Sequence, residues 1–169
     1  MTSRTLLVYY SMTGNTRKLA EEIGDAVGAD VEEIRELHAR HGLSGMWRAM
    51  VDTLLHREPA LLPVQHDPAD YDLLVLGGPV WASHAASPVR AYARQWGEKT
   101  KDVALFCTEG RRGAEEAFAE LRPFFHRLPV ATVAVDAGHL RPGDHREAMQ
   151  QFVAHLKTPP STSAYSPPT

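Results

Sequence analysis

The sequence is poor in cysteine, in long apolar runs and in charge of one sign. With one cysteine in 169 residues, no disulfide can form within the chain, which favours a reducing compartment such as the cytoplasm. No stretch approaches the roughly 20 apolar residues of a membrane span, and the first apolar run is too short for a signal peptide. A net charge of −3 without a dense basic face argues against nucleic-acid binding.

The remaining composition is typical of one globular domain. Hydrophobic residues make up 43% of the chain and charged residues 23%, and the length allows a continuous core without disulfides. We expect the domain to cover residues 1–157. Residues 158–169 are mostly Pro, Ser and Thr and carry no charge, so we expect a disordered tail there.

Five apolar runs predict strands, and helix-like segments separate them. The runs cover residues 5–10, 30–34, 72–78, 102–108 and 131–138, of which 30–34 is the weakest. The strong runs are apolar throughout instead of alternating with polar residues, as in parallel strands that are buried on both faces. Strands that alternate with helices in this way predict a doubly wound α/β domain.

Short polar residues follow the first predicted strand, at the point where a helix begins. This loop consists of Ser11, Met12, Thr13, Gly14, Asn15 and Thr16. Free N–H groups and the positive end of the helix dipole meet at such a turn, and the glycine lets a bound group approach the backbone. A helix start needs only one capping hydroxyl, so the three hydroxyls and the amide favour a phosphate site.

Three segments of the chain resemble the flavodoxins. The motif SMTGNT at 11–16 resembles their phosphate-binding loop, GGPVWASHAASPVR from residue 77 resembles a segment of many flavodoxin-like proteins, and FCTEGRRG from residue 106 resembles their Phe-x-Thr-x-Gly-Gly loop. The resemblance covers residues 6–156. It implies a flavodoxin-like, five-stranded parallel sheet in the order 2-1-3-4-5, with helices on both faces and FMN at the switch point between strands one and three.

The resemblance also implies which residues contact FMN. The phosphate is expected at 11–16, and the flavin ring at two later loops, whose candidate residues are Pro79, Val80, Trp81, Ala82, Ser83, His84, Thr108, Glu109, Gly110, Arg111 and Gly113. Trp81 is expected to form an aromatic wall beside the ring. His84 either lies near the reactive N5 atom or an incoming substrate, or is an ordinary surface histidine.

Arg111 departs from the family pattern, because relatives often have a second glycine there. If Arg111 or Arg112 faced the N1 and C2-carbonyl edge of the flavin, it would stabilise the negative charge of the reduced ring and raise the potential of the second reduction step. The alternative, that both arginines point into solvent, stays open. Cys107 is read as a small buried hydrophobe and not as a nucleophile.

An amphipathic helix is predicted within residues 43–59. His56 and several arginines surround it, either as a solvated helix surface or as a rim over the active face. Trp47, on this helix, and Trp96 are both expected in the core.

Two functions are compatible with these features. The first is a flavodoxin-like electron carrier between redox partner proteins; the second is an NAD(P)H-dependent FMN quinone reductase with a small electron acceptor. Carrier flavodoxins tend to be strongly acidic, which a net charge of −3 fits poorly. We name no catalytic residue, because the flavin carries the chemistry. No metal ligand is predicted. A homodimer stays open as an assembly.

Overall fold

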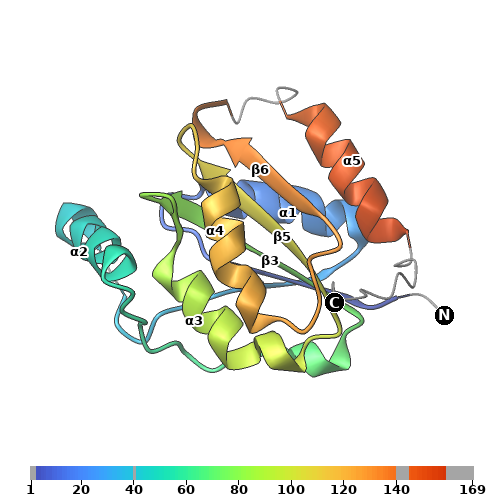
Figure 1. The fold of residues 1–169 in the computed structure, drawn as a ribbon, viewed down its shortest axis with the longest axis horizontal. Helices are drawn as coiled ribbons and strands as arrows, with labels where there is room; N and C mark the ends of the chain where they lie inside the picture. The colour runs from blue at the N-terminus through green and yellow to red at the C-terminus, as the bar shows by residue number, and fades with distance from the viewer. Residues whose placement is uncertain (1–2, 40, 140–144, 159–169) are drawn as a thin grey trace, which may run out of the picture.

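The computed structural model describes residues 3–39, 41–139 and 145–158, which form a parallel sheet between two helical layers (Figure 1). The parallel strands are β1 (Thr5–Tyr9), β2 (Asp30–Glu33), β3 (Leu73–Trp81), β5 (Asp102–Glu109) and β6 (Thr132–Asp136). They lie side by side in the order β2-β1-β3-β5-β6. Counted as parallel strands alone, this is the predicted order 2-1-3-4-5. The short strand β4 (His84–Ala85), which the sequence did not predict, pairs antiparallel with the end of β3.

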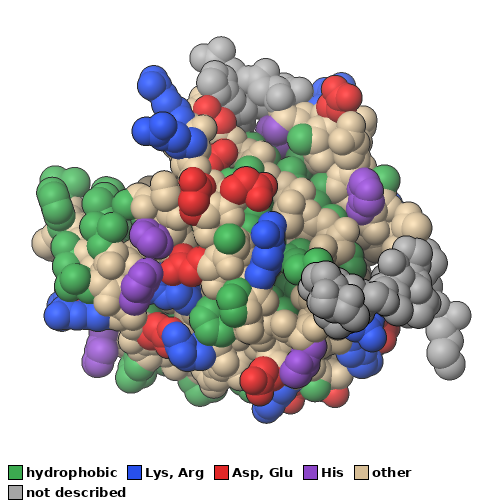
Figure 2. All heavy atoms as spheres, in the orientation of Figure 1, with side chains coloured by type: hydrophobic (Ala, Val, Ile, Leu, Met, Phe, Trp, Pro, Cys, Tyr) green, Lys and Arg blue, Asp and Glu red, His purple; other side chains and the backbone are tan. Residues whose placement is uncertain are grey.

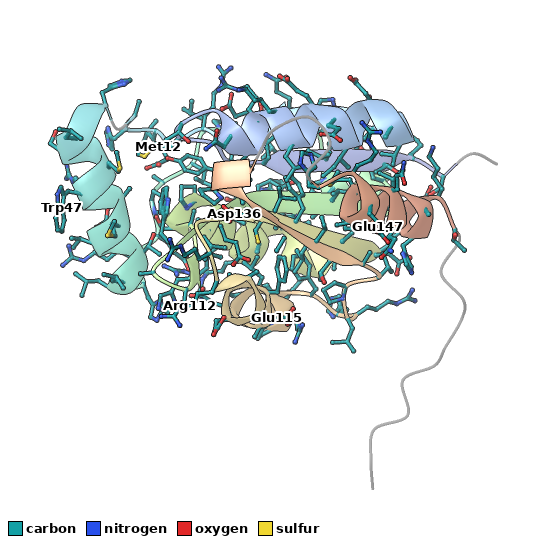
Figure 3. All side chains as sticks on the ribbon, turned by 90° about the horizontal axis from the view of Figure 1, so that it is seen from above. Met12, Trp47, Arg112, Glu115, Asp136 and Glu147 are labelled. Carbon is teal, nitrogen blue, oxygen red and sulfur yellow. The ribbon has the colours of Figure 1, made fainter. Side chains whose placement is uncertain are left out.

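Helices cover both faces of the sheet. They are α1 (Asn15–Val27), α2 (Gly42–Leu54), α3 (Ser87–Trp96), α4 (Ala114–Leu121) and α5 (Arg146–Lys157), with short 3-10 helices η1 (Pro68–Asp70), η2 (Gly97–Lys99), η3 (Arg122–Phe124) and η4 (Ala137–His139). One face packs against α1 and α5, and the other against α3 and α4. The helix α2 stands apart from both layers, on the side where the strands end (Figures 1 and 3).

The apolar runs reflect two separate cores, one on each face of the sheet. In β1, Leu6 and Val8 belong to the core under α3 and α4, whereas Leu7 and Tyr9 belong to the core under α1 and α5. Successive side chains of a strand point to opposite faces, so a strand in the middle of a covered sheet is apolar throughout. Each fully buried leucine or valine contributes roughly 1.5–3 kcal/mol of hydrophobic stabilisation.

A glycine in the middle of the sheet allows an aromatic ring to cross its strand. A Cβ atom added at Gly77 on β3 would lie 2.3 Å from the nearest ring carbon of Phe106 on β5. The two residues are partners in the β3–β5 register, and Phe106 is buried. The absent side chain therefore makes room for the phenyl ring.

The expectation for Trp47 is wrong, whereas that for Trp96 is confirmed. Trp47 is 69% exposed on α2, because the side of this helix that packs inward carries the small residues Gly45, Ala49 and Thr53. Trp96 is partly buried against the core under α3 and α4. The tail predicted at 158–169 lies, beyond its first residue, outside the described part of the chain. None of the helices in the described ranges has the length and apolar character that a bilayer crossing requires.

Candidate functional site

Three loops meet beyond the ends of β1, β3 and β5, as the sequence predicted. They surround a cavity of about 160 Å³, lined by Met12, Thr13, Asn15, Thr16, Met46, Pro79, Val80, Trp81, Thr108, Glu109, Gly110 and Ala137. Figure 3 shows Met12 at this end of the sheet, beside α2. The other predicted residues, Ser11, Gly14, Ala82, Ser83, His84, Arg111 and Gly113, belong to the same loops but do not line the cavity.

The first loop presents the open N-terminus of α1. Gly14 has φ of +93°, and a Cβ atom there would meet nothing within 4 Å, so the left-handed backbone rather than crowding calls for glycine. Its N–H donates to Ser11 Oγ at 3.1 Å. No side chain caps α1, and its first turn has no acidic residue. The N–H groups of this turn and the helix dipole therefore face outward, an arrangement suited to an anion.

A buried hydroxyl pair joins the first loop to the third. The Oγ1 atoms of Thr16 and Thr108 lie 2.8 Å apart, and the two residues are only 2% and 3% exposed. Either hydroxyl could be the donor. Whichever one donates, the other keeps a proton, so the pair as a whole retains one donor for a bound group.

The second loop is a tight hairpin between β3 and β4. Trp81 pairs with His84, and the turn residues Ala82 and Ser83 have φ values of 49° and 65°. Two successive positive φ values are typical of a type I′ turn, which glycine and asparagine normally occupy. Holding other residues in this region costs on the order of 1–3 kcal/mol each, and such strain often occurs at functional sites.

Aromatic and glycine contacts fix the position of this hairpin. The Trp81 ring meets the Tyr10 ring edge to face, with centroids 6.0 Å apart and planes at 89°. The Tyr10 hydroxyl donates to Glu36 at 3.0 Å. A Cβ atom at Gly113, where φ is +112°, would lie 2.8 Å from the Cα atom of Ser83. The glycine at 113 therefore allows the hairpin tip to pack onto the third loop.

In the third loop, the carboxylate of Glu109 is hydrogen-bonded to the protein itself. Glu109 Oε2 accepts a hydrogen bond from the Ala114 N–H at 2.9 Å, which caps the start of α4. Arg111 and Arg112 are exposed, and neither lines the cavity. Cys107 is buried, and burial raises the pKa of its thiol, which confirms the reading of a small buried hydrophobe.

Sequence reasoning missed Met46 as a cavity residue. Met46 lies on α2 and lines the cavity together with Trp81. The periodicity of α2 identified a helix, but no local pattern could place that helix over the loops. A larger cavity of about 660 Å³ lies against α2, and its lining includes His38, His41 and Arg48. None of the residues that line this larger cavity also lines the three-loop cavity, so the predicted alternative of a rim over the active face stays a prediction.

The His84 side chain contacts Glu120 and His56 and does not line the three-loop cavity. Its Nδ1 atom lies 3.6 Å from Glu120 Oε2 on α4, and its ring contacts the ring of His56. The backbone of the hairpin thus belongs to the candidate site, whereas this imidazole takes part in a separate cluster.

The strand order and the three convergent loops define a flavodoxin-like α/β protein. A profile of the flavodoxin family matches residues 4–155, and the chain belongs to that family. No curated protein sequence matched.

Solved structures of related proteins share this fold. A flavoprotein from Lactobacillus acidophilus, solved in complex with FMN, is 20% identical with a TM-score of 0.69, and the match covers 89% of this chain and 98% of that one. A protein from Bacteroides uniformis assigned as a flavoprotein is 23% identical with a TM-score of 0.75, over 91% and 99% of the two chains. The two-electron reduced flavodoxin of Megasphaera elsdenii is 24% identical with a TM-score of 0.58, over 91% and 99%.

Proposed function

We propose that the protein transfers electrons through FMN bound noncovalently at the three-loop cavity. Membership of the flavodoxin family supports this cofactor, and so does the FMN complex of the Lactobacillus acidophilus relative. The observation that carries the proposal is the uncapped N-terminus of α1 behind the left-handed Gly14, placed at the cavity where the loops converge. FMN supplies the redox chemistry, and the chain supplies binding, orientation and electrostatics.

The residues present fit the parts of FMN. A phosphate dianion suits the N–H groups and hydroxyls of residues 11–16, where no acidic side chain lies in the first turn of the helix. The flat ring suits the half-buried Trp81, which Tyr10 holds from the side. Met46 offers an apolar side chain from α2 at the edge of the cavity.

The phosphate assignment is tested by comparing FMN with riboflavin, which lacks the phosphate. We expect calorimetry to give one FMN per chain, and riboflavin to bind at least about tenfold more weakly, because it makes no charge-assisted hydrogen bonds to the first loop. Thr13→Ala should weaken FMN and leave riboflavin unchanged. Thr132→Ala, on the exposed edge of β6, is the matched control. Absence of FMN binding, or equal affinities for the two flavins, would overturn the proposal.

The partner of the flavin is either a redox protein or a nicotinamide nucleotide. A carrier exchanges electrons with protein partners in a reducing cytoplasm. The second candidate is an NAD(P)H-dependent reductase with a small acceptor. The cavity against α2 offers it Arg48 and two histidines, alongside the carboxylates of Glu36 and Asp52. Arginine is suited to the phosphates of a dinucleotide.

Anaerobic addition of NADH or NADPH to the FMN-loaded protein separates the two candidates. Bleaching of the flavin absorbance by the nucleotide alone supports the reductase, and Arg48→Ala should then raise the nucleotide KM, whereas Lys157→Ala on exposed α5 should not. Reduction that requires a separate reductase protein supports the carrier.

A further inference from the structure

A histidine–histidine–glutamate cluster lies between the end of α2, the β3–β4 hairpin and α4. His56 follows α2, His84 lies on β4 and Glu120 lies on α4. One ligand atom from each residue lies within 4.8 Å of the other two, and in the described ranges no other three such residues meet in this way. Figure 2 shows histidine and acidic side chains gathered on the surface beside α2.

We propose that this cluster binds a divalent transition-metal ion, with Zn²⁺ as the fitting ion. His56 Nδ1 lies 3.5 Å from Glu120 Oε1, and His84 Nδ1 lies 3.6 Å from Glu120 Oε2. In a tetrahedral zinc site, ligand atoms at about 2.0–2.2 Å from the metal are about 3.4 Å from each other. The two histidine–glutamate spacings are close to that value, and all three ligand atoms lie within 4.8 Å of one another, so the side chains need to draw together to share one ion. Two imidazoles and a carboxylate are ligands that zinc accepts, and three protein ligands leave a fourth position for water.

The carboxylate of the cluster is held in place by a buried arginine. Arg90 Nη1 donates to Glu120 Oε1 at 2.8 Å, and the Ala85 N–H donates to Oε2 at 3.0 Å. Arg90 is only 3% exposed, so its position on α3 is fixed by packing. An ionised carboxylate has about four lone-pair sites, of which these bonds use two. Such outer hydrogen bonds orient a metal ligand, although the positive charge of Arg90 also reduces the attraction for a cation.

The two imidazoles are arranged to share one ion. Their ring centroids lie 5.2 Å apart with planes at 83°, and both Nδ1 atoms approach the same carboxylate. His56 has a left-handed backbone with φ of 52°, which directs the chain back after α2. The His56 side chain is 59% exposed, which leaves an entry path for the ion. A bound ion would connect the end of α2, the hairpin and α4.

No local sequence pattern predicts this site. The three ligands are far apart in the chain and form no short motif of the kind that marks zinc sites. Only the hairpin turn at 82–83 and the packing of α4 bring them together. The proposal does not depend on FMN binding, because none of the three residues lines the three-loop cavity.

The test is calorimetric titration of ZnCl₂ into the full-length, tag-free chain after treatment with a chelator. We expect one tightly bound zinc per chain. His84→Ala and His56→Asn should each weaken that binding by at least about 100-fold, because loss of a ligand costs more than the 10–100-fold loss typical of second-shell partners. Asparagine is chosen at 56 because it tolerates the left-handed backbone.

His66→Ala is the matched control, because His66 Nδ1 lies 2.9 Å from Glu32 Oε2 without a third ligand. Zinc binding should be unchanged in this variant. Glu120→Gln should also abolish the site, but it disturbs Arg90, so circular dichroism must show a folded chain before it is scored. Absence of zinc uptake by the wild type, or uptake that survives both histidine substitutions, would overturn the proposal.

Discussion

The buried hydroxyl pair between Thr16 and Thr108 offers a quantitative test of the candidate site. Thr16→Val keeps the shape and the β-branch of the side chain but leaves the Thr108 hydroxyl buried without its partner. An unsatisfied buried polar group costs about 1–3 kcal/mol, whereas replacing both partners with apolar groups can be nearly neutral. We therefore expect Thr16→Val and Thr108→Val, each made alone, to lower the free energy of unfolding by about 1–3 kcal/mol. The double variant should lose less than the sum of the two single losses.

The same substitution predicts a separate effect on flavin binding. The pair retains one hydroxyl proton, which we expect a phosphate oxygen of FMN to accept. A hydrogen bond to a charged group contributes about 1.5–3 kcal/mol, so Thr16→Val should raise the FMN Kd by roughly 10- to 150-fold. Riboflavin has no phosphate, so its Kd should not change through this contact.

Urea unfolding of the flavin-free variants measures the first effect, and flavin fluorescence titration measures the second. Thr132→Val, on the exposed edge strand, is the control and should change neither quantity. If the losses from Thr16→Val and Thr108→Val were strictly additive in the double variant, the two hydroxyls would not be hydrogen-bonded to each other. An FMN affinity that Thr16→Val leaves unchanged would contradict the role at the phosphate.

Three further outcomes are expected. Gly77→Ala should destabilise the fold by about 1–3 kcal/mol because its Cβ would overlap the Phe106 ring, and adding Phe106→Leu should restore part of the loss in urea unfolding. Because burial shields Cys107 and raises its pKa, iodoacetamide at pH 8 should leave the native protein unmodified and alkylate it in urea; rapid native alkylation would contradict this. Exposed Arg111 does not line the cavity, so Arg111→Ala should leave the potential of the second reduction step unchanged; a drop near 60 mV, a tenfold effect, would instead place its charge at the flavin.

The strands were predictable because a strand that is buried on both faces consists of consecutive apolar residues, which can be recognised in the sequence. Leu73 to Leu76 are all buried, two on each face of the sheet, so their run reads as continuously apolar. The edge strand β6 alternates exposed and buried residues, since only one of its two faces is well covered. The order of the strands came from the family resemblance, and the structure confirms it.

The features that sequence reasoning missed depend on contacts between distant segments. The hairpin at 81–84 turns through Ala82 and Ser83, which lack the asparagine–glycine pattern that normally marks a two-residue turn. On α2, periodicity revealed an apolar face that includes Trp47, but it could not show that the helix packs through Ala49 instead. The apolar face of a helix shows that the helix is amphipathic. Which of its faces packs against the protein depends on the tertiary structure.

Two glycines of the family motifs show why a motif match does not by itself define a ligand contact. Gly14 and Gly113 both have positive φ, so both need glycine for the backbone alone. Space beside Gly14 is open, so a bound group can approach the backbone there, whereas Ser83 fills the space beside Gly113. The first glycine therefore leaves the backbone open at the proposed phosphate loop, and the second allows close packing of the hairpin that carries Trp81. The three-dimensional structure is needed to distinguish these two roles, since the sequence shows the same residue in the same kind of loop.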